Sequence, residues 1–321
     1  SRRQRQMCIR DRNHMEQVLT KALAFVAVIA LGYFLKKRGF FKPHDYELIA
    51  KIVLNITLPC AVITSFAAFK MDYTLFILTL IGFCGNLLMI AWGFILTRYQ
   101  TNAAKIFYVF NLAGYNIGCF TLPFAQSFLG PFAVVATCMF DVGNSIMCTG
   151  GTYALTSGLV HTGEKYEPVN LRSIAAKLLG SVPFVVYMLM LVCAVLQLHL
   201  PQPVYTLTGL IGGANTFLSM LMIGMMFEMT LDLDKLKQVR EVVLYRYVFG
   251  IALAWLCFYH VPLSAEVKEV LTLVFLAPST AIGPIFIARM GGNVELAGFA
   301  NSITIVLSII LMTLFFTFLH I

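Results

Sequence analysis

Charged side chains are scarce in this sequence. Asp, Glu, Lys and Arg make up 12% of the residues, whereas apolar residues make up 59% and the mean hydropathy is +0.83. A typical soluble domain carries about 25% charged residues. This shortage excludes a soluble globular domain and predicts a protein that lies in a membrane. We therefore expect the lipid bilayer to be one of its partners.

Cysteine and histidine motifs are missing as well. The eight cysteines occur singly, mostly within apolar segments, with no CxxC pair and no Cys/His pair at metal-ligand spacing. The six histidines lie in the N-terminal segment, in loops or at the ends of apolar segments. Single cysteines in apolar segments usually act as small buried hydrophobes. We therefore expect no disulfide framework, no metal site and no cofactor.

Two classes of function are excluded by patterns that the chain does not contain. Its net charge of +8 comes from cations in short loops beside apolar segments, and these form no basic groove that would bind nucleic acid. An intramembrane protease needs two aspartates or a Ser/His pair in mid-span. This sequence has one such aspartate and neither a GxGD nor a GxSG motif, so we do not expect an enzyme.

The first fourteen residues, SRRQRQMCIRDRNH, lack the apolar core of a signal peptide. They hold five arginines and one aspartate, and without them the net charge falls from +8 to +4. We interpret residues 1–14 as a non-native or disordered tail, so that the pattern described below starts at Met15. A genuine basic arm is the alternative.

Long apolar runs account for the rest of the chain. A helix needs about 20 apolar residues to cross the roughly 30 Å of bilayer hydrocarbon. Ten runs reach this length, so we predict an all-α integral membrane protein with ten transmembrane helices. The predicted spans are 17–35, 46–69, 72–97, 104–128, 131–158, 172–198, 203–229, 242–260, 265–288 and 293–320.

Landmarks at a constant offset indicate that the ten spans are two repeats of five. Pro123 and Pro284, each with a glycine seven residues later, lie 161 positions apart, and Asn55 and Asn215 lie 160 apart. Paired interruptions at matching places in two halves are typical of a transporter's binding site. The predicted parts are a first repeat over 15–160, a short cytoplasmic linker at 161–171 and a second repeat over 172–321.

The positive charges predict the orientation. Without the tail, fifteen lysines and arginines, Arg246 among them, lie in or beside the loops after the odd-numbered spans, and three lie on the other side. Cytoplasmic loops are enriched in Lys and Arg. We therefore predict a multi-pass protein of the plasma (inner) membrane, with both termini outside and the central loop cytoplasmic. Because each half has five spans, the second repeat is inverted relative to the first.

Glycine and proline interrupt the fourth and ninth spans, which read NLAGYNIGCFTLPF and LAPSTAIGPIF. Unwound backbone survives in a membrane only where protein buries it or where it lines a wet cavity. Helix N-termini at such a break favour an anion. Proline tolerated without any function is the alternative. We predict that the two spans face each other near mid-membrane and bind substrate through Asn116, Gly118, Pro123, Ser279, Thr280 and Pro284.

Polar side chains within other spans suggest further roles. Asp141 is the only acidic residue well inside a span, and Asn144 shares its helix face. A carboxylate in mid-membrane usually marks an ion or proton path, so we assign both residues to a coupling proton or sodium ion. An aspartate that caps a neighbouring helix is the alternative.

Three asparagines complete the predicted site. Asn301 in the tenth span is the weaker counterpart of Asp141 and Asn144 in the second half, and we assign it to the same coupling role. Hydrogen bonding between helices explains its position equally well. Asn55 and Asn215 place a carboxamide at similar depth in the two halves. A carboxamide both donates and accepts, which suits a substrate carboxylate or a cation.

Several motifs together resemble the auxin efflux carrier family. The motifs are LGYFLKKRGFF, LNITLP, NIGCFTLPF, LGPF and FDVGNS, and the resemblance covers essentially all of residues 15–320. The resemblance implies membership of a superfamily with bile-acid symporters and sodium–proton antiporters. It also implies a ten-helix inverted repeat whose broken helices four and nine cross beside the substrate, here at 116–123 and 279–284.

The family includes plant auxin exporters and bacterial carriers of small carboxylates such as malate and malonate. Plant exporters often have a long hydrophilic central loop, whereas this one has about a dozen residues, which resembles a bacterial-type organic-anion carrier. We expect a secondary active transporter of a malate-like, malonate-like or auxin-like anion that works by alternating access, with a homodimer as the assembly considered. The alternatives are a sodium-coupled symporter of the bile-acid type and a non-transporting membrane receptor.

Overall fold

The protein is a helical, multi-pass membrane protein. In the computed structural model every regular element of the described residues is a helix, and the one β contact among them is an isolated antiparallel bridge between Tyr115 and Ser279. Within the part of the chain that the structure describes, seven helical runs are long and apolar enough to cross a membrane, or eight if a bent pair is one span. The expected all-α class is thereby confirmed. The structure describes residues 2–69, 72–160, 171–227 and 236–318.

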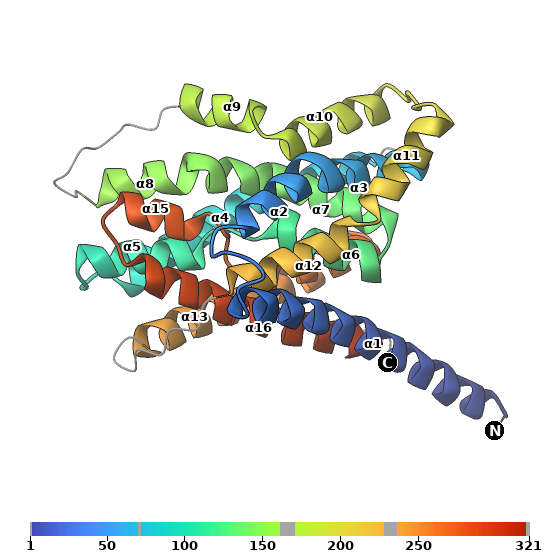
Figure 1. Cartoon of the computed structure of the whole chain (residues 1–321), viewed down its shortest axis with the longest axis horizontal. Coiled ribbons are helices and arrows are strands. Elements are labelled where there is room, and N and C mark those ends of the chain that lie inside the picture. The colour runs from blue at the N-terminus through green and yellow to red at the C-terminus, as the bar shows by residue number, and fades with distance from the viewer. Residues whose placement is uncertain (1, 70–71, 161–170, 228–235, 319–321) are drawn as a thin grey trace.

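The helices are labelled in Figure 1. Three of the short elements, η1, η4 and η5, are π-helical turns, and η2 and η3 are 3₁₀ turns. The order is α1 (Arg2–Lys37), α2 (Tyr46–Ile52), η1 (Val53–Thr57), α3 (Leu58–Ser65), η2 (Phe66–Ala68), η3 (Tyr73–Leu75), α4 (Phe76–Leu96), α5 (Asn102–Leu112), η4 (Ile117–Thr121), α6 (Leu122–Phe128), α7 (Pro131–Ile146), η5 (Met147–Gly151), α8 (Thr152–Leu159), α9 (Leu171–Leu179), α10 (Val182–Val195), α11 (Gln202–Gly212), α12 (Asn215–Met226), α13 (Leu236–His260), α14 (Ala265–Phe275), α15 (Gly283–Arg289) and α16 (Val294–Phe318).

Proline explains two of the π-helical turns. Pro59 and Pro123 stand at the second positions of α3 and α6. A proline has no N–H to donate to the carbonyl four residues before it. Those carbonyls belong to Asn55 and Cys119, which lie inside η1 and η4. The helix therefore widens at these points without breaking, and π-helical turns of this kind are frequent at functional sites.

Two expected spans are interrupted by non-helical backbone. The first interruption is residues 113–116, between α5 and η4, and the second interruption is residues 276–282, between α14 and α15. The first contains Gly114, whose φ of +83° is the left-handed conformation that glycine adopts readily. Pro123 lies within α6 and ends no helix, whereas Pro284 stands in the first turn of α15, directly after the second interruption.

The sixth expected span, 172–198, is two helices and not one straight rod. α9 and α10 meet at an angle of 80°. Gly180 and Ser181 separate them, and Pro183 stands at the second position of α10. Pro183 has no N–H to donate to the carbonyl of Leu179, the last residue of α9, and glycine ends helices readily, so the bend follows from this short sequence.

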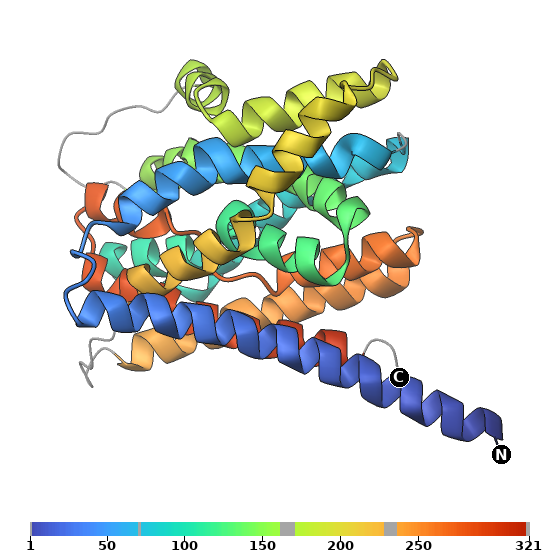
Figure 2. The same ribbon diagram turned by 45° about the vertical axis from the view of Figure 1, so that its right-hand side comes forward.

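Long helices packed side by side make up the body of the molecule. α1 lies along α12 and α4 lies along α7, while α9 and α10 form an outer layer on the side away from α1 and α13 (Figures 1 and 2). Glycines permit the close contacts: a Cβ on Gly224 would lie 2.0 Å from the Ile29 carbonyl oxygen, and one on Gly143 would lie 2.0 Å from that of Thr79. Small residues at helix contacts are typical of membrane proteins.

The start of α1 and the end of α16 lie at the same end of the molecule (Figure 2). The end of α8 and the start of α9 lie at the opposite end in both ribbon views. The backbone of α1 continues as helix from Arg2 into the expected membrane span. The side chains of residues 2–14, like the expected linker residues 161–170, lie outside the described residues.

Candidate functional site

The two interruptions lie directly against each other. Tyr115 and Ser279 form the antiparallel bridge, and the Asn116 N–H donates to the Pro278 carbonyl at 3.0 Å. Tyr115 and Ser279 are each 1% exposed, and Asn116 is 8% exposed. Two predicted site residues from opposite halves of the chain, Asn116 and Ser279, are therefore brought together in the interior.

Two buried asparagines pair with the backbone of the first interruption. Asn86 Oδ1 accepts the Gly114 N–H at 2.7 Å, and Asn144 Oδ1 accepts the Tyr115 N–H at 3.1 Å. Asn144 Nδ2 also donates to the Tyr115 carbonyl at 3.0 Å, and Asn86 Nδ2 donates to Asn144 Oδ1 at 3.1 Å. Buried backbone groups need partners, and here carboxamides take the place of a neighbouring strand. Asn86, in α4, was not predicted; its position inside an apolar span is the signal that could have found it.

Asp141 is buried in α7 beside this network. Its Oδ1 accepts a hydrogen bond from Asn144 Nδ2 at 2.8 Å, and its Oδ2 accepts one from the Tyr187 hydroxyl at 3.4 Å. Asn144 thus contacts both the predicted coupling carboxylate and the first interruption. The partners of the Asp141 carboxylate are side chains of α7 and α10 rather than amides at the start of a neighbouring helix.

Side chains of α16 support the second interruption in the same way. Asn301 Nδ2 donates to the Ser279 and Thr280 carbonyls at 3.1 and 3.2 Å, and Thr304 Oγ1 accepts the Ser279 N–H at 3.2 Å. Ser308 Oγ donates to the Leu276 carbonyl at 2.7 Å. Asn301 therefore contacts extended backbone in the second half as Asn144 does in the first.

Arg246 of α13 contacts both interruptions and is 1% exposed. Its two terminal nitrogens donate to the carbonyl oxygens of Asn111, Leu112, Gly114, Ala277 and Pro278. The expectation that Arg246 lies in or beside a loop is therefore wrong. Without it, the predicted orientation depends on fourteen cations on one side of the membrane and three on the other. The error has a simple cause, because a single charge near the end of an apolar run looks the same in the sequence whether it faces solvent or the core.

The predicted pair of Asn55 and Asn215 is not brought together. Asn55 is exposed, and its Nδ2 donates to the Lys51 carbonyl one turn earlier at 2.8 Å. Asn215 is fully buried, and its Oδ1 accepts from the Thr57 hydroxyl of η1 at 3.1 Å. Asn215 Nδ2 and the hydroxyl of Ser219, one turn further along α12, are buried without a hydrogen-bond partner. Both side chains are 0% exposed.

The other predicted residues surround the interruptions at different depths. Gly118 is half-buried in η4, where a Cβ would lie 3.2 Å from Leu58 Cδ2, and Pro123 is buried in α6. Thr280 and Pro284 are half-buried at the second interruption and the start of α15. Thr280 also reaches the first half of the chain, because a Cβ on Gly114 would lie 2.7 Å from its Cγ2.

No group of three or more His, Cys, Asp or Glu side chains that could hold a metal ion occurs in the described part of the chain. The arrangement offers carboxamides, hydroxyls, one carboxylate and one guanidinium around the two interruptions. In comparisons with known proteins, no family model matches the chain and no curated protein matches its sequence.

Proposed function

We propose that this protein is a secondary active transporter that moves a small organic anion across the membrane by alternating access. The observation that carries the proposal is the pairing of the two interruptions, which joins extended backbone from distant parts of the chain inside a bundle of apolar helices. Interrupted helices that meet in this way build the binding sites of many transporters.

The proposed architecture is ten transmembrane helices in a five-plus-five inverted repeat. Each predicted span corresponds to one helix or one run of consecutive helices in the described residues. The fourth, made of α5, η4 and α6, and the ninth, made of α14 and α15, are the broken and crossing helices. In this scheme, residues 15–160 and 172–321 are the two repeats.

A bound anion is supported by buried donors of α12. The Nδ2 of Asn215 and the hydroxyl of Ser219 have no acceptor within the protein. A buried donor without a partner is costly, so a ligand that supplies an acceptor is favoured. We propose that the substrate contacts Asn215 and Ser219 together with the half-buried residues Gly118 and Thr280 near the interruptions.

Coupling to a proton or a sodium ion is proposed for Asp141. The Asp141 carboxylate is buried and accepts a hydrogen bond from Asn144, which in turn bonds to the backbone of Tyr115 in the first interruption. A change in its charge or ligands would therefore act on the Tyr115 backbone through a single side chain. Asn301 contacts the second interruption, and no carboxylate is among its described hydrogen-bond partners. We therefore propose that Asn301 supports the backbone of the second interruption.

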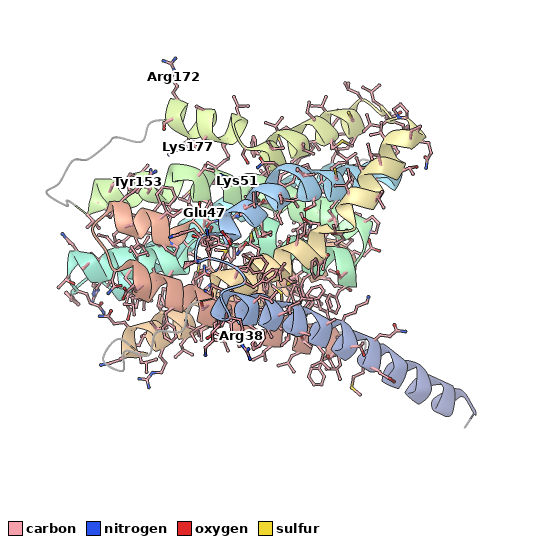
Figure 3. All side chains as sticks on the ribbon, viewed as in Figure 1. Arg38, Glu47, Lys51, Tyr153, Arg172 and Lys177 are labelled. Carbon is pink, nitrogen blue, oxygen red and sulfur yellow. The ribbon has the colours of Figure 1, made fainter. Side chains whose placement is uncertain are left out.

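The distribution of cations supports the proposed orientation. Arg38, Lys51, Arg172 and Lys177 lie toward the left of Figure 3, away from the start of α1 and the end of α16, with Glu47 among them. Because Lys and Arg are enriched on the cytoplasmic side, we propose that this end is cytoplasmic, that both chain termini are outside, and that the protein lies in a plasma (inner) membrane.

For the class of substrate, we propose a carboxylate of the malate or malonate type and membership of the auxin efflux carrier family as a bacterial-type carrier. The motifs that resemble this family include NIGCFTLPF and FDVGNS, which lie at the first interruption and around Asp141. The short segment between α8 and α9 argues against a plant-type auxin exporter. A homodimer is the proposed assembly.

The test is uptake of radiolabelled malate or malonate into proteoliposomes that contain the purified protein. We expect saturable flux that a panel of unlabelled dicarboxylates inhibits. An absolute requirement for sodium would favour the bile-acid type of symporter, and ligand binding without any flux would identify a receptor. Absence of flux and of binding for every member of the panel would overturn the proposal.

A further inference from the structure

Arg246 makes more polar contacts with the interruptions than any other described side chain. Three of the carbonyls that it contacts, those of Asn111, Leu112 and Gly114, belong to the first interruption or the helix end before it. The other two, those of Ala277 and Pro278, belong to the second. No carboxylate pairs with it in the part of the chain that the structure describes.

Two of the five carbonyls, those of Asn111 and Leu112, belong to the last residues of α5, and the other three lie two or three residues beyond the ends of α5 and α14. The last carbonyls of a helix lack partners within that helix and carry its partial negative charge, roughly half an elementary charge. The end of α5 therefore offsets part of the charge of Arg246. The described hydrogen-bond partners of this buried guanidinium are all backbone carbonyls.

We propose that Arg246 is a positioning residue that joins the ends of α5 and α14, so that both interruptions move as one body. Arg246 and the two interruptions meet at the carbonyl of Pro278, which accepts hydrogen bonds from Arg246 Nη2 and from the Asn116 N–H, each at 3.0 Å. The connection between the halves is a structural property of the fold, and its consequence for transport rests on the proposed function.

An arginine suits this position better than a lysine. The guanidinium is planar and has five N–H donors, four of them on the two terminal nitrogens, whereas an ammonium has three donors at one point. The guanidinium carbon also lies 5.1 Å from the centroid of the Tyr115 ring, which belongs to the first interruption. A lysine would keep the charge and lose the simultaneous contact with both helix ends.

Amide hydrogen exchange measured by mass spectrometry tests the proposal without any assumption about transport. In Arg246→Gln, we expect exchange in peptides covering both interruptions to increase about tenfold or more, because hydrogen bonds to a charged group are lost on both sides. In Arg246→Lys, we expect a smaller increase, again on both sides. Arg240→Gln removes an exposed cation from the same helix and should leave both peptides unchanged.

Arg246→Lys carries the test if Arg246→Gln does not fold. An increase confined to α13 or to one interruption, or none in either variant, would overturn the proposal. In proteoliposomes, substitution of a residue that only holds the two interruptions together should lower the maximal rate and change KM by less than about twofold. Loss of a substrate contact would instead raise KM. If the Arg246 variants show the expected exchange pattern but the wild type shows no flux, the positioning role stands and the proposed function fails.

Discussion

At the scale of single residues, Asn144 links the first interruption to Asp141. One carboxamide bonds the N–H and the carbonyl of Tyr115, the amide of Asn86 and the carboxylate of Asp141. A carboxamide can do this because it offers two donors and a carbonyl with two lone pairs. Asn144 therefore serves both the backbone of the site and the proposed coupling residue.

Asn144→Ala should destabilise the protein strongly. It leaves the buried N–H of Tyr115 without a partner, at a cost of about 1–3 kcal/mol, and removes one of the two donors to the Tyr115 carbonyl, which the Ile117 N–H also contacts. We expect thermal unfolding in detergent to occur several degrees lower. Asn55→Ala is the matched control, since Asn55 is exposed and bonds only within its own helix, and it should change the midpoint little. Equal effects of the two substitutions would contradict the role of Asn144.

Asp141→Asn should separate transport from its driving ion. The change keeps the size of the side chain and removes its charge, so uptake should persist at a reduced rate and lose its dependence on pH and on sodium. Initial rates measured in proteoliposomes at several pH values, with and without sodium, provide the measurement. Glu47→Gln, which neutralises an exposed acid, should keep the wild-type dependence. A pH and sodium profile unchanged by Asp141→Asn would rule out coupling through this residue.

At the scale of elements, the structure distinguishes a widened helix from a broken one. Proline widens the turn before α3 and before α6, whereas the first interruption depends on Gly114 and on side chains from neighbouring helices. The difference is physical. A missing N–H costs one hydrogen bond, which one wider turn absorbs, but the four non-helical residues 113–116 leave several backbone groups that other helices must satisfy.

Gly114→Ala should be much more harmful than the same change at Gly39. Both glycines have φ near +80°, at +83° and +79°, so each substitution introduces backbone strain of about 1–3 kcal/mol. Only at Gly114 would the new Cβ collide, at 2.7 Å from Thr280 Cγ2 and 3.2 Å from Cys148 Sγ, whereas nothing lies within 4 Å at Gly39. The difference between the two unfolding midpoints measures the contact between interruptions, and no difference would argue against it.

At the scale of the whole molecule, close helix pairs set the position of the site. α1 packs along α12, which carries Asn215 and Ser219, and α4 packs along α7, which carries Asp141 and Asn144. Each pair depends on glycines that allow backbones to touch. The site residues are therefore positioned by contacts that lie elsewhere on the same helices.

Gly224→Ala should separate α1 from α12. Its Cβ would lie 2.0 Å from the Ile29 carbonyl oxygen. A backbone atom cannot move away by changing a side-chain rotamer, so the helices themselves must shift. We expect a fall of several degrees in the unfolding midpoint, together with reduced substrate binding because Asn215 shares the helix. Gly158→Ala, in α8, meets nothing within 4 Å and should be neutral or slightly stabilising. Unchanged stability of Gly224→Ala would show that this contact does not hold the two helices.

Much of the architecture was predictable from the sequence, because a helix in lipid must be long and apolar. Among the described residues, seven helical runs, or eight with the bent pair, are long and apolar enough to cross a membrane, and Asp141 and Asn144, which were singled out because polar groups are rare in such runs, lie buried in one of them. The equivalence of Asn55 and Asn215 was a weaker prediction. An offset of 160 residues places two asparagines at similar depth but does not determine which way either side chain points, and Asn55 points away from Asn215.

The sequence by itself determined that this protein is a set of apolar helices, where those helices are weak, and which polar side chains lie within them. These properties follow from local composition and from the low polarity of the bilayer. Only the tertiary structure decided that the two interruptions bond to each other, that Asn86 and Asn301 support them, and that Arg246 is the cation at their centre. Unpaired backbone groups must find partners, and which side chains supply them depends on how distant helices pack.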